Sequence, residues 1–112
     1  MSKEEHYSKG MECFSDDHLN MAVQELKKAV ELDPKYGDAL HALAMCYYHQ
    51  EDIDNALKWG KRFLEVEPYN PLAYTSLSIF FNAKGMIQEA EEMIAKAKTA
   101  DQEDNSDSVS LV

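Results

Sequence analysis

Two imidazoles and a thiol lie close together in the chain, at His41, Cys46 and His49. Side chains of these types are good ligands for zinc or copper. In a helix, successive residues are rotated by about 100°, so His41 and Cys46 would lie roughly 140° apart around the axis. The three side chains would not converge on one ion. The sequence therefore predicts no metal and no cofactor, and the histidines are expected to line a binding surface.

Motifs that carry catalysis are absent from the sequence. It contains no nucleophile elbow, phosphate-binding glycine loop, HExxH or paired CxxC. The acidic residues are expected mainly on outward helix faces and in turns, where charge is usually solvated. Cys13 and Cys46 fall within helical patterns and are predicted to be reduced structural thiols. These features favour a binding protein over an enzyme.

The charge of the chain restricts its partners. Its 21 Asp and Glu against 11 Lys and Arg give a formal net charge of −10, which repels nucleic-acid phosphates and anionic lipid. Neither nucleic acid nor a membrane is an expected partner. No apolar run has the length of a signal-peptide core or of a membrane span, which needs about 18 residues. A cytoplasmic protein is therefore expected.

The elements that must position these side chains repeat with a fixed period. Pro34 and Pro68 each follow a helical run that ends in an acidic residue, and their spacing matches the period of roughly 34 residues known for two-helix repeats. One apolar helical stripe lies before Pro68, formed by Ile53, Ala56, Leu57, Gly60, Phe63 and Leu64. All six positions one period earlier are also apolar, as are four of the six positions one period later. Three two-helix units are therefore predicted.

The repeated pattern resembles that of the tetratricopeptide repeat family, in which W-x2-L-G-x2-Y is followed by A-x3-F and a proline. The middle unit matches it at Leu40, Leu43, Ala44, Tyr47, Ala56, Gly60 and Pro68. The first unit matches at Gly10, Ala22, Ala29 and Pro34, and the third at Leu77, Phe81, Ala90 and Ala97. Two departures are that no unit opens with Trp and that Gln102 stands where a third proline would fall.

The resemblance implies an all-α fold, a right-handed superhelical array (α-solenoid) of three antiparallel helix pairs. The units would cover residues 3–36, 37–70 and 71–100, approximately. Residues 101–112 are acidic, rich in serine and without helical periodicity, and are predicted to form a disordered tail. Their last three residues, Ser110-Leu111-Val112, resemble the C-terminal motif that PDZ domains bind, although an ordinary solvated tail is the favoured interpretation.

Polar residues near both ends predict that the array is complete with three units. His6 and Lys9 stand at the front where the middle unit has leucine, and Glu91 and Lys98 do so at the back. Two further residues of the last helix, Met86 and Met93, allow two interpretations. They either line the edge of the last helix pair or form an apolar surface for self-association into a homo-oligomer.

The resemblance also implies that the first helices of the units line a concave groove. The groove residues that it implies are Glu4, Tyr7, Met11 and Phe14 in the first unit, Asp38, His41, Met45, Tyr48 and His49 in the second, and Leu72, Thr75, Ile79 and Asn82 in the third. Helical spacing independently places most of them on one stripe of each helix, namely Tyr7, Met11 and Phe14; His41, Met45, Tyr48 and His49; and Leu72, Thr75 and Ile79. The alternative is that part of this stripe belongs to the core and that the groove is narrower.

Methionine and tyrosine side chains suit a partner with apolar surface. The chain is therefore predicted to be a non-catalytic adaptor or scaffold that binds an apolar or amphipathic peptide in the groove. The alternative is a structural subunit that self-associates or packs into a larger complex. One subclass of the family grips the acidic C-terminal tails of chaperones with cations, but the corresponding places here hold Tyr7, Met11, Ala42, Leu72 and Ser76. Binding of such a tail is not expected.

Overall fold

The computed structural model describes the backbone of residues 1–109 and the side chains of residues 1–100. This part of the chain forms six α-helices and no strand, which confirms the predicted all-α array of three helix pairs. The first, third and fifth helices begin one repeat period apart, and so do the second, fourth and sixth. The helices are α1 (Lys3–Ser15), α2 (Leu19–Leu32), α3 (Gly37–His49), α4 (Ile53–Val66), α5 (Pro71–Ala83) and α6 (Ile87–Val109).

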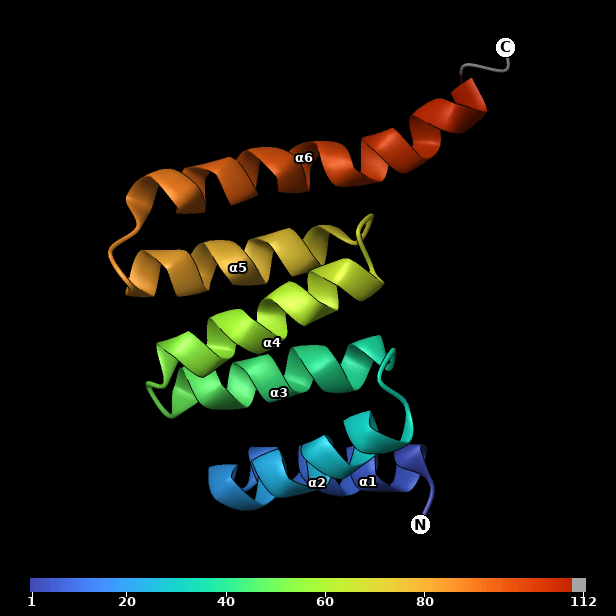
Figure 1. Cartoon of the computed structure of the whole chain (residues 1–112), viewed down its shortest axis with the longest axis vertical. Coiled ribbons are helices and arrows are strands. Elements are labelled where there is room, and N and C mark those ends of the chain that lie inside the picture. Colours follow the sequence, from blue (N-terminus) through green and yellow to red (C-terminus); the bar gives the residue numbers. More distant parts are fainter. Residues whose placement is uncertain (110–112) are drawn as a thin grey trace.

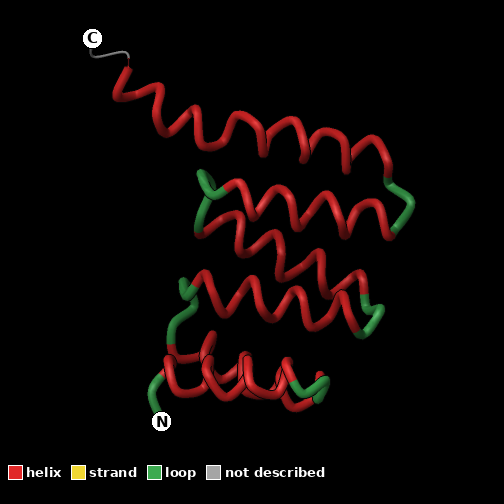
Figure 2. Tube along the Cα trace, turned by 180° about the vertical axis from the view of Figure 1, so that it is seen from behind, coloured by secondary structure: helices red, strands yellow, loops and turns green. Residues whose placement is uncertain are grey.

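The helices form a single stack, with the α1–α2 pair at one end and α6 at the other (Figure 1). Each helix packs against the one that follows it in sequence, and α1 also contacts α3. Short loops alternate between the two sides of the stack, so successive helices are antiparallel (Figure 2). The molecule measures 47 × 34 × 20 Å along its principal axes. Contacts between neighbours in sequence therefore build the whole fold, as in other helical repeats.

Local sequence signals set where several helices begin. Ser2 and Glu5 form a capping box at the start of α1, each side chain bonding the other residue's backbone amide. The Asp52 side chain accepts from the amide of Asn55 at the start of α4. At the start of α5, the Asn70 side chain accepts from the amide of Leu72 at 3.0 Å. These caps satisfy backbone amides that have no partner within the helix.

The loop inside each helix pair has the same conformation in all three units. Asp17 and Glu51 have a φ of 63° and Gly85 a φ of 80°, and the three residues occupy equivalent positions of their units. In each loop, the backbone amide of the residue after the positive-φ residue donates a hydrogen bond to the carbonyl oxygen five residues before that amide. The N···O distances are 2.8, 2.9 and 2.8 Å. Glycine adopts a positive φ at little cost, whereas other residues are strained there.

This repeated loop gives a testable prediction. Glu51→Gly should raise the free energy of unfolding by roughly 0.5–1 kcal/mol, because relief of about 1–2 kcal/mol of left-handed strain exceeds the entropic cost of glycine. Gly85→Ala at the equivalent place should lower it by a similar amount. Urea denaturation followed by circular dichroism measures both. A lower free energy of unfolding for Glu51→Gly would show that the Glu51 side chain stabilises the fold by more than its positive φ costs.

The core runs through the whole stack. Its largest fully buried side chains are Leu26, Leu40, Leu43, Cys46, Leu77 and Phe80. Close approach of the helices depends on two glycines. A Cβ atom at Gly10 would lie 2.8 Å from Cγ of Leu26, and one at Gly60 would lie 3.0 Å from Cδ2 of Leu77. Small residues at these crossings therefore let α1 pack on α2 and α4 pack on α5.

The front end of the array differs from the prediction. The His6 side chain is only 13% exposed and faces α2, where its Nδ1 atom lies 2.7 Å from Oε2 of Glu25, so it is not part of a polar outer face. The outer face of α1 instead carries Glu5, Ser8 and Glu12, all exposed. The equivalent residues of α3 are buried, namely Ala39, Ala42 and Cys46. Polar side chains on α1 therefore occupy the places that α3 fills with buried apolar side chains.

The back end matches the prediction more closely, because Glu91 and Lys98 are exposed on α6. Met86 and Met93 are half-buried and pack against the core, so they line the edge of the last helix pair. Up to residue 100, the large apolar side chains exposed on α6 are those of their neighbours Ile87 and Ile94, at 53% and 42% exposure. An association surface on this helix would thus consist of the isoleucines rather than the methionines.

Helix α6 also extends beyond residue 100, where a disordered tail was expected. It continues to Val109. Neither proline nor glycine occurs between Ile87 and Val109, and Gln102 replaces the proline that ends the equivalent helix in the other units. A helix without such a residue keeps its backbone hydrogen bonds. The terminal Ser110-Leu111-Val112 lies outside the described residues.

Candidate functional site

The predicted groove residues come from α1, α3 and α5. Because these helices have the same length and begin one period apart, residues separated by one period occupy equivalent places. They form four rows across the three helices, namely Glu4, Asp38 and Leu72; Tyr7, His41 and Thr75; Met11, Met45 and Ile79; and Phe14, Tyr48 and Asn82. We call the first the acidic row and the third the apolar row, and the four together the A-helix face.

None of the predicted groove residues is fully buried. The aromatic and methionine side chains, together with His41, are half-buried, whereas the α5 residues, His49 and the two carboxylates are exposed. Leu72 and Ile79 are 45% and 38% exposed. A single exposed apolar side chain is ordinary, so what distinguishes these residues is that they continue the rows formed by side chains of α1 and α3, which in the case of Ile79 are half-buried. The A-helix face therefore belongs neither to the core nor to the fully solvated surface.

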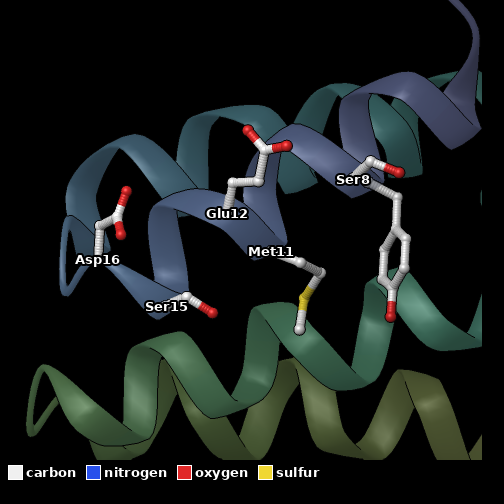
Figure 3. Close-up of a pocket in the computed structure, with 6 residues that line it drawn as sticks. Ser8, Met11, Glu12, Ser15 and Asp16 are labelled. Atoms are coloured by element: carbon white, nitrogen blue, oxygen red, sulfur yellow. The ribbon is translucent and has the colours of Figure 1, made fainter.

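A hollow of about 500 Å³ lies along α1. Figure 3 shows the Met11 side chain pointing from α1 toward α3, with Glu12 pointing the other way. Tyr7 and Met11 were predicted as binding residues, and the other four were not. The lining residues are Tyr7, Ser8, Met11, Glu12, Ser15 and Asp16. A comparison with α3 gives a signal for Ser8 and Glu12, since their counterparts there, Ala42 and Cys46, are apolar and buried.

A second hollow, of about 470 Å³, lies where α3, α4 and α5 meet. It is lined by the predicted Tyr48 and His49 and by Glu51, Ile53 and Ala83, which were not predicted. The predicted residues of α1 and α3 therefore line separate hollows. Glu4 lines neither of the two above but a further hollow of about 440 Å³, with Met1, Glu5, Ser8, Lys9 and Glu12. Leu72, Thr75 and Ile79 line none of these hollows and lie on the surface of α5.

Aromatic contacts connect the three units beneath this face. The Phe14 ring of α1 meets the His49 ring of α3 edge-on, with centroids 5.4 Å apart. Tyr48 of α3 lies 5.5 Å from His49 and also 5.5 Å from Phe80 of α5. Aromatic rings at these separations attract one another beyond the burial of their area. The aromatic side chains are therefore held in place before any partner binds.

His41 joins the second unit to the third. Its Nε2 atom lies 3.0 Å from Oγ of Ser76, and its ring lies 5.2 Å from the Phe63 ring. Burial lowers the pKa of His41, although the carboxylates of Asp38 and Glu67 oppose this effect. The neutral imidazole is thus favoured, and the side chain takes part in packing between units as well as bordering the surface.

The lowered pKa of His41 has a consequence for stability. Below its ordinary pKa, near 6.5, the unfolded chain binds a proton that the folded chain resists, so stability should fall as the pH drops from 7 through 6. His41→Gln should reduce this dependence, whereas His18→Gln, at an exposed position, should leave it unchanged. Urea denaturation at several pH values measures the slope. The same slope in both variants would contradict a role for His41.

The side chains that first suggested a metal site do not form one. Burial raises the pKa of Cys46 to about 11, so its thiol stays protonated at neutral pH. His41 faces Ser76, and His49 faces Phe14 and Tyr48. Within the described side chains, no three His, Cys, Asp or Glu residues are grouped so that they could hold a metal ion.

Comparison with known proteins relates the chain to one family. Models described as tetratricopeptide repeat match residues 6–36 and 25–58. A curated relative, mouse sperm-associated antigen 1, is 40% identical over 57 residues, which are 51% of this chain and 6% of that protein. The chain therefore spans only a small part of the length of that relative.

Several solved structures share the fold. The crystal structure of MamA has a TM-score of 0.88 and 26% identity, and the match covers 94% of this chain and 61% of that one. The first TPR of Spaghetti (RPAP3), bound to the HSP90 peptide SRMEEVD, has a TM-score of 0.85 and 15% identity, with 90% and 80% covered. Among the residues that the structure describes, no helix is long and apolar enough to cross a membrane.

Proposed function

Because the chain belongs to the tetratricopeptide repeat family, we propose that it is a non-catalytic adaptor that binds a segment of a partner protein across the A-helix face. Relatives with this fold are known in complex with polypeptides, among them the RPAP3 repeat with its HSP90 peptide and a CopN–Scc3 complex. The proposal extends this mode of action to the present chain.

The observation that carries the proposal is the partial exposure of the apolar row. Met11 and Met45 rest on the core with one side uncovered, and Ile79 is 38% exposed. Covering one such side chain contributes on the order of 1.5–3 kcal/mol before the cost of ordering is subtracted. Three or four such anchors suffice for a micromolar complex. The segment that covers this row is therefore apolar or amphipathic.

Acidic chaperone tails are poor candidates for this partner. The family's cationic grip would require Lys, Arg or Asn at places that hold Tyr7, Met11, Ala42, Leu72 and Ser76. Ala42 and Ser76 are moreover buried, and the hydroxyl of Ser76 is bonded to His41. The carboxylate of a bound tail would lose its hydrating water at these places, and no Lys or Arg would be there to compensate for that loss.

The proposal is tested by selecting binders from a random library of short peptides displayed on phage. A selected peptide should bind the wild-type protein with a micromolar dissociation constant and lose affinity when the apolar row is changed. Selected peptides that are insensitive to such changes would show that another surface is the binding site.

A second candidate function is self-association, and one observation favours it. Ile87 and Ile94 are exposed on the outer side of α6, where the equivalent stripe of α4 packs against the next helix pair. Light scattering at high protein concentration should give the mass of a monomer if the adaptor proposal alone holds. A multiple of the monomer mass would indicate association. If the double variant Ile87→Ser with Ile94→Ser then has the mass of a monomer, the association occurs through α6.

A further inference from the structure

Ionised side chains are unevenly distributed over the A-helix face. Helix α5 has no Asp, Glu, Lys or Arg, and the only one on α3 is Asp38. On α1, both lysines are directed to other elements. Lys3 Nζ lies 2.6 Å from Oδ2 of Asp33 at the end of α2, and Lys9 Nζ lies 3.9 Å from a carboxylate oxygen of Glu25 within α2.

The carboxylates that remain on this face are not neutralised. Glu4 and Asp38 are exposed, and within residues 1–100 neither forms an ion pair. The charge on this face is therefore negative, and it is confined to the side of the first two units.

Two tyrosines lie beside these carboxylates. The rings of Tyr7 and Tyr36 have centroids 5.4 Å apart, and we call them the tyrosine pair. Burial and the nearby Asp38 carboxylate raise the pKa of both phenols, and Glu4 adds to the effect at Tyr36. The carboxylates are thus close enough to act on the space around the rings.

The chain itself places a cation against this pair. Lys3 Nζ lies 5.1 Å from the centroid of the Tyr36 ring while it is also bonded to Asp33. Aromatic faces attract ammonium and guanidinium groups, and neighbouring carboxylates strengthen the attraction. The contact shows that an ammonium group fits on an aromatic face here. The Glu4 carboxylate also acts on Lys3, but neither Glu4 nor Asp38 is taken up by an ion pair within residues 1–100.

The apolar row lies two helical turns beyond the acidic row. From Glu4 to Met11 and from Asp38 to Met45 the chain advances by one heptad, or about 10 Å along a helix. A ligand that covers both rows must therefore present cationic side chains along one edge and apolar side chains along the other.

We propose that the segment bound by this face is cationic and amphipathic. A Lys or Arg side chain of the partner lies against the tyrosine pair and between the Glu4 and Asp38 carboxylates. Its apolar side chains cover the apolar row, about 10 Å away. This inference rests on the proposed function, and it specifies the charge of the partner, which the proposed function leaves open.

The test begins with the peptides selected from the random library, because their composition is an outcome in itself. Lys and Arg should be enriched over Asp and Glu relative to the unselected library. The most enriched peptide, synthesised with a fluorescein label, should bind about tenfold more weakly to Glu4→Gln with Asp38→Asn. The matched control is Glu31→Gln with Glu65→Gln, which removes two exposed carboxylates from α2 and α4 and should leave the affinity unchanged.

A charge reversal tests the pairing directly. The same peptide with Glu in place of its Lys and Arg residues should fail to bind the wild-type protein but bind Glu4→Lys with Asp38→Lys. Selected peptides that are neutral or acidic, or equal affinity for the two carboxylate double variants, would overturn the inference. If such peptides still lose affinity on substitution of Ile79, the proposed function stands. If no peptide does so, the proposed function itself is wrong.

Discussion

Phe80→Ala is expected to lower the free energy of unfolding by about 3–5 kcal/mol. Phe80 is fully buried on α5, where its ring lies 5.5 Å from that of Tyr48 and against the backbone of Gly60. Removal of the ring would leave a cavity between α3, α4 and α5. The helices that surround it are fixed by their own contacts, so the cavity cannot readily collapse.

The loss should separate the third unit from the first two, because stability in a repeat array depends on contacts between neighbouring units. Urea denaturation followed by circular dichroism should show a lower midpoint and a broader transition. The matched control is Ile79→Ala at the adjacent position, which is partly exposed and should cost less than about 1 kcal/mol. Equal losses for the two variants would contradict the assignment of Phe80 to the interface between units.

The second large effect is on binding. Ile79→Lys should weaken the affinity for a selected peptide by about a hundredfold, because it removes an apolar contact and places a charge where the peptide excludes water. Its effect on the free energy of unfolding should stay below about 1 kcal/mol, since the lysine can extend into solvent from this position. Fluorescence polarisation with a labelled peptide measures the dissociation constant.

Met21→Lys is the matched control for this change. Met21 is an apolar residue that is 52% exposed, but it belongs to α2 and lies outside the A-helix face. Met21→Lys should leave the affinity for the selected peptide within about twofold of that of the wild type. A loss of affinity in Met21→Lys that equals the loss in Ile79→Lys would indicate that charge anywhere on the surface disturbs binding.

Much of the fold could be predicted because the sequence repeats its own structure. The spacing of Pro34 and Pro68 and the apolar stripe before each define helix pairs, and the observed helices recur with the same period. The front of the array was harder to assign. His6 corresponds to buried Leu40, and apolarity alone does not say whether a buried position faces its own helix pair or the preceding one. The structure shows that His6 faces its own pair, through Glu25.

Less of the candidate site could be predicted. Helical spacing identifies the rows of the A-helix face, but Tyr36 precedes α3 and lies outside any helical stripe, so periodicity gives no signal for its contact with Tyr7. The bond between His41 and Ser76 links residues of successive units, which only the packing of one unit on the next brings together. Whether the rows bind a peptide remains a prediction.

The central claim is that a polypeptide segment binds across α1, α3 and α5. Titration of the 15N-labelled protein with a selected peptide, followed by NMR, tests this most directly. The proposal predicts the largest changes in amide chemical shift around Met11, Met45 and Ile79, with small changes on α2 and α4. Changes concentrated around Ile87 and Ile94 of α6, with none along the apolar row, would contradict it.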